Sequence, residues 1–148
     1  MEIVEIKERQ DFFKCFHAFK ELRPHLVDAE SFVNQVIEQQ KEGYTVCAIF
    51  DDEDPNSAVS VIGYRAMTTL AWGRCIYIDD LSTRSACRSK GYGTALLRHV
   101  IDLAQQQGYV MVHLDTGYTR HAAHRVYLRN GFQISYHHLS LTCQPKSA

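Results

Sequence analysis

The chain has 148 residues, of which 45% are hydrophobic and 22% charged, and its formal net charge is −1. These values are ordinary for a globular protein, and we expect a single domain over residues 1–148. The balanced charge provides no global field for nucleic acid or an anionic membrane, and no apolar run approaches membrane-spanning length. The five cysteines are an odd number without CxxC spacing, which argues against disulfides and zinc and favours a reducing cytoplasm.

The first part of the chain is predicted to form two helices and then three strands. The helices show apolar residues at helical spacing, and the second begins with an Asp or Ser cap. The strands are rich in β-forming residues, and the third is apolar except for Asp79 and Asp80. These five segments span residues 8–21, 28–41, 44–50, 57–70 and 75–83.

The second part continues with a glycine-rich turn and then alternates helix and strand. The amphipathic helix over 93–107 is the strongest signal, and a buried strand, a further helix and a last strand follow it. These three segments span residues 109–116, 119–130 and 132–141. The whole order predicts a mixed α/β domain.

The turn before the helix at 93–107 has the features of an anion site. Gly91 and Gly93 let the backbone approach a ligand closely, and Arg88 and Lys90 add positive charge. The free N–H groups and the dipole of a helix N-terminus favour negative charge, so the ligand is expected to carry phosphate. The turn contains neither GxxxxGK[ST] nor GxGxxG. Taken alone, it is equally compatible with a tight turn whose cations are solvated.

Two blocks in this sequence resemble the GNAT acetyltransferase superfamily. YIDDLSTRSACRSKGYGTALLRHV, at 77–100, is similar to its acyl-coenzyme A loop, in which an acidic strand leads into R/Q-x-x-G-x-G/A and a helix. AAHRVYLRNGF, at 122–132, is similar to its A-x-x-x-Y-x-x-x-G-F element. The two blocks occur in the family's order and spacing, and the resemblance covers residues 58–141. The strand 75–83 particularly resembles the polyamine acetyltransferase branch.

The resemblance implies a GNAT-like fold, with a twisted, mostly antiparallel sheet that splays at the coenzyme site and is flanked by helices. It implies that acetyl-coenzyme A pairs its pantetheine arm with the strand backbone at Leu81, Ser82 and Thr83. The pyrophosphate then contacts the loop residues Arg88, Ser89, Lys90, Gly91, Tyr92, Gly93 and Thr94. Ala123 also falls on the coenzyme pattern, and Arg120, where the family has a small residue or Asn, is expected to reach the phosphates.

By resemblance, Tyr127 is the acid that protonates the departing thiolate, Asp79 is the base and Asp80 binds the ammonium group of the acceptor. A base is needed because deprotonating a primary amine at pH 7 costs roughly 4–5 kcal/mol. Adjacent strand residues face opposite sides, so one aspartate is expected to face the acetyl group and the other elsewhere. Three alternatives stay open: a core tyrosine, an aspartate that only pairs with an arginine, and His137 or His138 as base.

The resulting prediction is a cytoplasmic N-acetyltransferase that transfers acetyl from acetyl-CoA directly to a primary amine of a small molecule or peptide. It implies no metal, no nucleic acid and no membrane partner, and allows a homodimer, which is common among relatives. The alternative is a non-catalytic acyl-CoA-binding module, which would need the loop but neither Tyr127 nor the aspartate pair.

Overall fold

The computed structural model describes residues 1–145, and its contacts divide the chain into two compact units. The first unit is Met1–Leu114, and the second begins at Asp115. In the described residues every strand belongs to the first unit. The single domain over residues 1–148 stays a prediction, and its last residues, 146–148, lie outside the described residues.

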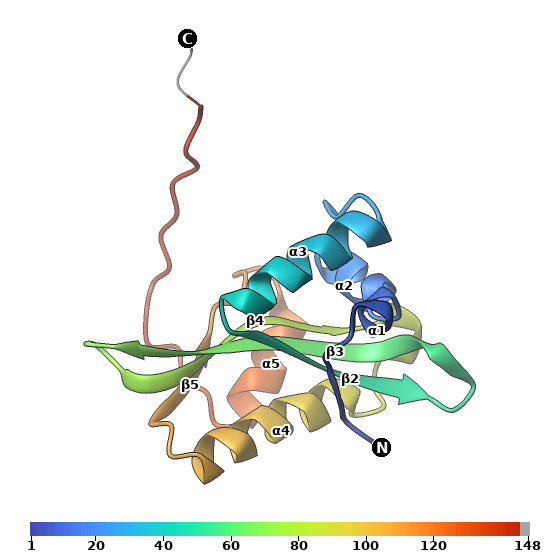
Figure 1. Cartoon of the computed structure of the whole chain (residues 1–148). Coiled ribbons are helices and arrows are strands. Elements are labelled where there is room, and N and C mark those ends of the chain that lie inside the picture. The colour runs from blue at the N-terminus through green and yellow to red at the C-terminus, as the bar shows by residue number, and fades with distance from the viewer. Residues whose placement is uncertain (146–148) are drawn as a thin grey trace. The chain divides into compact units, whose positions relative to one another are not determined.

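One five-stranded sheet, with its strands in chain order, forms the centre of the first unit (Figure 1). Its strands are β1 (Val4–Ile6), β2 (Tyr44–Asp51), β3 (Asp54–Thr69), β4 (Gly73–Thr83) and β5 (Met111–Leu114). The pairs from β1 to β4 are antiparallel, whereas β5 runs parallel to β4 because a helical crossover connects them. The predicted mixed α/β fold with a mostly antiparallel sheet is therefore confirmed.

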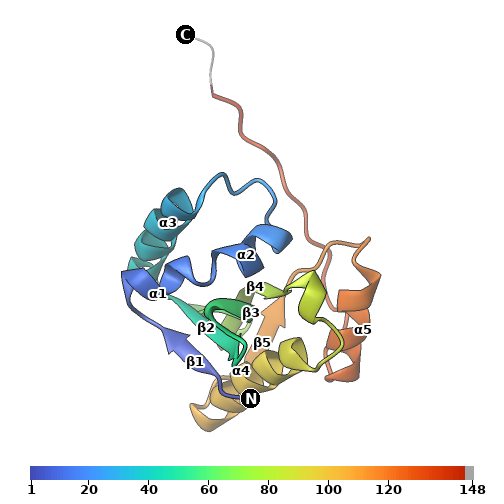
Figure 2. The same ribbon diagram turned by 90° about the vertical axis from the view of Figure 1, so that its right-hand side faces the viewer.

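Helices cover both faces of this sheet. They are α1 (Arg9–Phe13), α2 (Phe16–Leu22), α3 (Ala29–Lys41) and α4 (Tyr92–Gln106). Figures 1 and 2 show α1, α2 and α3 on one face and α4 on the other. The predicted cap of the second helix is Asp28, whose carboxylate accepts a hydrogen bond from the Ser31 N–H at 2.8 Å.

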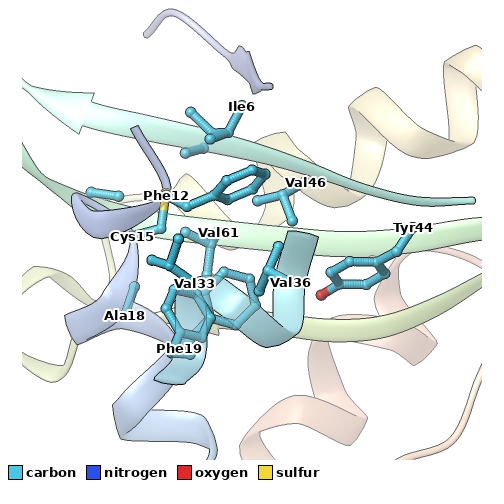
Figure 3. Close-up of a cluster of buried hydrophobic side chains, with 13 residues drawn as sticks. Ile6, Phe12, Cys15, Ala18, Phe19, Val33, Val36, Tyr44, Val46 and Val61 are labelled. Atoms are coloured by element: carbon cyan, nitrogen blue, oxygen red, sulfur yellow. The ribbon is translucent and has the colours of Figure 1, made fainter. Parts of the chain in front are cut away.

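The central strands β2 and β3 are buried on both faces. Strands of this kind read as nearly continuous apolar runs, as 44–50 and 57–63 do, because neither face meets water. Toward α1, α2 and α3 they contribute to a cluster that contains Phe12, Phe19, Val33, Val46 and Val61 (Figure 3). Tyr44 lies at one end of this cluster, next to the candidate site described below.

The helix predicted over 8–21 is interrupted in the structure. α1 ends at Phe13 and α2 begins at Phe16, although neither glycine nor proline separates them. The Lys14 carbonyl accepts a hydrogen bond from the Ala58 N–H of β3 at 2.8 Å. Because that carbonyl bonds to the sheet, it is not available to continue the helical ladder, and the helix breaks there.

The last strand of the sheet is shorter and more exposed than predicted. A buried strand was expected over 109–116, but β5 spans only Met111–Leu114, and Val110 and Met111 keep 71% and 41% of their surface exposed. β5 forms an edge of the sheet within the first unit, so only β4 pairs with it there. No helix among the described residues is long and apolar enough to span a bilayer.

The second unit contains α5 (His121–Arg129) and a segment without regular secondary structure over 132–145. The strand predicted over 132–141 is therefore wrong for the described chain. Its β-forming residues lack a hydrogen-bonded neighbouring strand, and Ile134 and Leu139 are 85% and 88% exposed. His138 instead lies 3.1 Å from the Asp115 carboxylate.

Candidate active site

A β-bulge in β4 determines where the two predicted aspartates point. Gly63 of β3 is opposite Asp80, but the next residue, Tyr64, is opposite Ile78, so Asp79 is the extra residue in β4. An inserted residue shifts the alternation of side chains by one position. Both carboxylates consequently line one pocket, and the prediction that they face opposite sides is wrong.

This pocket has a volume of about 360 Å3 and lies entirely within the first unit. The aspartates come from β4, as does Tyr77, and the facing side chains come from α2, α3, β2 and the segment after α2. The facing residues are Phe19, Arg23, His25, Leu26, Phe32, Gln35, Val36, Gln39 and Tyr44. The lining therefore combines apolar and aromatic surface with a few charged groups, as is typical of small-molecule sites.

Asp80 is held from two directions. Its Oδ2 accepts a hydrogen bond from Tyr44 Oη at 2.5 Å, and its Oδ1 accepts one from Arg23 Nε at 2.9 Å. The Asp80 side chain is only 13% exposed. Burial, and then the adjacent Asp80 charge, raise the pKa of Tyr44 well above its ordinary value, so its phenol keeps the proton that it donates.

Gly63 makes the contact between Tyr44 and Asp80 possible. Gly63 is the register partner of Asp80, and the tyrosine hydroxyl crosses the strand at this position. A Cβ on residue 63 would lie 1.7 Å from Tyr44 Oη, a distance that no side chain can occupy. A glycine inside a strand often marks such a close approach.

Asp79 forms a paired contact with Arg65 of β3. Arg65 Nε lies 3.0 and 3.1 Å from the two carboxylate oxygens, and its Nη2 lies 2.7 Å from Oδ2. The hydrogen bonds that Arg65 donates to Asp79 raise the pKa of Arg65, and its guanidinium also lies 5.4 Å from the centre of the Tyr44 ring. Both aspartates thus pair with an arginine, the alternative that the sequence left open for each.

Beyond the bulge, β4 extends past its neighbour β5. The β4–β5 ladder ends at the pair Ile78 and Leu114, whereas β4 continues to Thr83. The Ser82 hydroxyl donates to the Ala18 carbonyl at 2.7 Å, and the Thr83 hydroxyl lies 2.8 Å from that of Ser60. These side chains therefore bond within the first unit, and on the β5 side the backbone at 81–83 has no paired strand in this unit.

The glycine loop follows directly and adopts left-handed backbone conformations. Ser89 has φ 65° and Gly91, the residue before α4, has φ 82°. No side chain caps the N-terminus of α4, so the N–H groups of its first turn are available to a ligand. Arg88 Nε donates to the Thr83 carbonyl at 3.3 Å, which holds this cation against the end of β4. Lys90 is exposed.

Position 93 requires glycine for a different reason than position 91 does. A Cβ at this position would lie 3.3 Å from Thr83 Oγ1, which is tight, whereas a Cβ at Gly91 would meet open space. Gly93 thus allows α4 to pack closely against the end of β4, and Gly91 provides the positive φ. Through Arg88 and Gly93, the loop thus contacts Thr83 at the end of the strand that carries the aspartates.

The remaining predicted residues belong to the second unit. Arg120 precedes α5, Ala123 lies in its first turn, and Tyr127 is 8% exposed with its ring 5.8 Å from that of Phe132. Burial raises the pKa of Tyr127, which keeps its phenol protonated at neutral pH. The roles of Arg120, Ala123 and Tyr127 toward the coenzyme and the thiolate stay predictions.

Sequence reasoning missed Arg23, Arg65 and Gly63. Arg23 and Arg65 are far from the aspartates in sequence, and no local pattern points from one to the other. Gly63 did provide a signal, because it interrupts an otherwise β-forming run.

Comparisons with known proteins identify the family. The sequence model of the acetyltransferase (GNAT) family matches residues 7–132. A curated protein of Bacillus subtilis (strain 168), the uncharacterized N-acetyltransferase YhdJ, is 32% identical over 133 residues, which are 88% of this chain and 90% of its own length. Streptothricin acetyltransferase of Streptomyces lavendulae is 30% identical over 88 residues, or 55% of this chain and 47% of its own.

Solved structures agree on the fold. The crystal structure of a probable acetyltransferase superposes with a TM-score of 0.81 at 17% sequence identity, covering 99% of this chain and all of its own. The chain belongs to the GNAT family of acetyltransferases and is an acyltransferase enzyme.

Proposed function

We propose that this acetyltransferase transfers an acetyl group from acetyl-CoA directly to a primary amine of a small molecule or peptide. One observation carries the proposal: a single strand, β4, leads from the carboxylate pocket through an unpaired stretch into the glycine loop. Asp80 and Thr83 are three residues apart, which is about 10 Å along a strand. A donor molecule and an acceptor amine would therefore meet within one unit.

The coenzyme is proposed to bind along the far end of β4. The amide groups of loop 88–94, aided by Arg88 and Lys90, would hold the pyrophosphate, because they combine a helix N-terminus with left-handed turns. The backbone of Leu81, Ser82 and Thr83 would pair with the pantetheine arm. The end of the β4–β5 ladder at Ile78 supports this assignment, since it leaves the β5 side of that backbone without a strand partner in the first unit.

Acetyl-CoA would supply an acetyl group activated as a thioester. Asp80 is proposed to hold the acceptor's ammonium group and Asp79 to take its proton, directly or through water, so that the neutral nitrogen forms the new bond to the acetyl carbon. The bond between that carbon and sulfur then breaks, and Tyr127 would give a proton to the sulfur. The nitrogen would release its second proton as it becomes an amide, and that proton, directly or through water, would restore the phenol. This role needs a phenol that is protonated at neutral pH, and Tyr127 meets that requirement because a phenol has a pKa of about 10, which burial raises further.

The contact with Arg65 bears on the choice of base. Arg65 contacts both oxygens of the Asp79 carboxylate, so an acceptor amine or a water molecule has to share this carboxylate with the guanidinium. The same contact fixes the orientation of the carboxylate.

Separate Asn variants test which aspartate is the base and which binds the ammonium group. Asp79→Asn should lower kcat with little change in acceptor KM, whereas Asp80→Asn should mainly raise that KM. Asp102→Asn, an exposed carboxylate on α4, is the matched control.

The decisive experiment for the function is product detection by mass spectrometry. The protein is mixed with acetyl-CoA and with amino acids, polyamines, aminoglycosides or lysine peptides, and a product heavier by one acetyl group is sought. Product mass is preferable to colorimetric thiol release, because all five cysteines are free thiols. Free cysteines also support our proposal that the protein works in the reducing cytoplasm. An absence of acetylated product across all classes, with coenzyme A bound, would contradict the proposed transfer.

A further inference from the structure

The charges around the acceptor pocket are balanced, contrary to what the acidic strand suggests. Asp79 and Asp80 line the pocket, but each carboxylate is paired with a guanidinium, that of Arg65 or that of Arg23. A cluster with two negative and two positive charges has no net attraction for a polycation. The acidic strand therefore gives no electrostatic support for a polycationic acceptor such as a polyamine.

Arg23, unlike Arg65, lines the pocket, and part of its hydrogen-bonding capacity is unused. Of its five N–H groups, the one on Nε bonds to Asp80 and one on Nη2 bonds to the Asp79 carbonyl, both at 2.9 Å. The others, on Nη1 and Nη2, make no hydrogen bond within residues 1–145, and the side chain remains 45% exposed. Arg23 also lines the pocket, and its open terminal fork matches the two oxygens of a carboxylate.

Asp80 offers the complementary group beside it. Each of its oxygens accepts one hydrogen bond, from Arg23 or from Tyr44, and a carboxylate has about four acceptor positions. Asp80 can therefore receive an ammonium group without losing its present partners. An anion site and a cation site thus lie next to each other in a pocket of about 360 Å3.

We propose that the acceptor is an amine that also carries a carboxylate, that is, an amino acid. Its carboxylate binds the terminal N–H groups of Arg23, and its ammonium group binds Asp80. Phe19, Phe32 and Val36 line the same pocket and are almost fully buried, so the side chain of this amino acid is apolar or aromatic. The inference rests on the proposed acetyl transfer, and it names the acceptor class for that site.

The test uses pairs of amines that differ only in the carboxylate. L-Leucine is compared with 3-methylbutylamine, and L-phenylalanine with 2-phenylethylamine. For each compound, acetylation is followed by mass spectrometry, and binding to the protein is measured separately by calorimetry. We expect the amino acid to be preferred by at least about tenfold in both readouts, because it gains a charge-assisted contact.

Variants of Arg23 then test whether this residue causes the preference for the amino acid over the decarboxylated amine. Arg23→Gln should remove it, by weakening binding of the amino acid at least about tenfold while the decarboxylated amine changes little. Arg23→Lys, which keeps the charge but not the fork, should restore part of it. Arg9→Gln removes the same charge at an exposed position of α1 and should leave the preference unchanged. Thermal unfolding checks that each variant is folded.

The outcomes separate this inference from the proposed function. Equal or tighter binding of the decarboxylated amine, or no binding of either member of a pair, overturns the amino-acid inference. Preference for the amino acid that persists in Arg23→Gln also overturns it, because the carboxylate is then bound elsewhere. Preferential binding that Arg23→Gln removes, but without acetylated product, supports the inference and contradicts the acetyl transfer.

Discussion

Gly63→Ala is the most direct test of how the pocket is built. The added Cβ would lie 1.7 Å from Tyr44 Oη and 2.3 Å from its Cζ, so the tyrosine ring has to move. Tyr44 is 4% exposed and its hydroxyl is bonded to Asp80, so the ring cannot move without losing that bond. A change that is usually mild in a strand is therefore expected to be severe here.

The expected cost follows from three contributions. Losing a hydrogen bond to a charged group costs about 1.5–3 kcal/mol, and forcing a buried ring from its place costs about 1–3 kcal/mol. Alanine recovers about 0.5–1 kcal/mol, because it is intrinsically better than glycine inside a strand. We expect Gly63→Ala to lower the free energy of unfolding by about 2–5 kcal/mol.

A double-mutant cycle in urea isolates the clash. Tyr44→Ala removes the ring, and in that background Gly63→Ala should be neutral or should stabilise by about 0.5–1 kcal/mol. The coupling between the two positions should therefore be at least about 2 kcal/mol. A cost of Gly63→Ala that is equal in both backgrounds, within about 0.5 kcal/mol, would refute the idea that the glycine makes room for Tyr44.

Three further predictions address the coenzyme, the acid and the buried thiols. Gly91→Val should weaken coenzyme A binding by roughly 10–150-fold in calorimetry, because a β-branched residue disfavours φ 82° and the loop amides turn away from the phosphates. Tyr127→Phe should lower turnover by about a hundredfold or more without changing coenzyme affinity. Raising the pH from 8 to 11 should destabilise the fold, because burial raises the pKa of Cys15 to about 12 and that of Cys47 to about 11. Below the pKa of 9.0 that a thiol has in the unfolded chain, the two buried thiols contribute their full stabilisation to the fold. This stabilisation is lost as the pH rises through their folded pKa values, at up to about 1.4 kcal/mol per pH unit for each thiol.

Each of these predictions has a matched control. Gly108→Val strains a second left-handed glycine, with φ 74°, outside the loop and should reduce stability without weakening coenzyme binding. Tyr118→Phe changes an exposed tyrosine of the second unit and should leave turnover intact. Cys143→Ala removes an exposed thiol and should not alter the alkaline loss of stability, whereas Cys47→Ala should reduce it. Coenzyme affinity retained in Gly91→Val, or full turnover in Tyr127→Phe, would contradict the assigned roles.

Much of the fold could be predicted because its signals are local. The helix over 93–107 and the strand over 75–83 are set by apolar periodicity within a few residues, and they agree with α4 and β4 to within two residues at each end. The break at Lys14 could not be predicted in this way. It depends on a hydrogen bond from Ala58, and no pattern within residues 8–21 records that partner.

The strand predicted over 132–141 failed for a related reason. Alternating apolar residues show that a segment can form a strand, but a strand exists only when another strand pairs with it. A β-bulge likewise leaves no signal in the sequence of one strand, because it depends on how two strands align. The sequence therefore indicated Asp79 and Asp80 as site residues, but it did not show that both lie on the same face of the strand.

The bulge and the arginines of the pocket depend on each other. By placing Asp79 and Asp80 on the same face, the bulge brings together two carboxylates that would repel each other if neither were neutralised. Arg65 compensates the first from β3, and Arg23 compensates the second from the end of α2. Arg23 lines the pocket whereas Arg65 does not, so Arg23 is the arginine of this pair whose remaining N–H groups can reach an acceptor. The same requirement that makes the bulged strand stable thus places a cation beside the amine site, which is why the acceptor should carry a negative charge of its own.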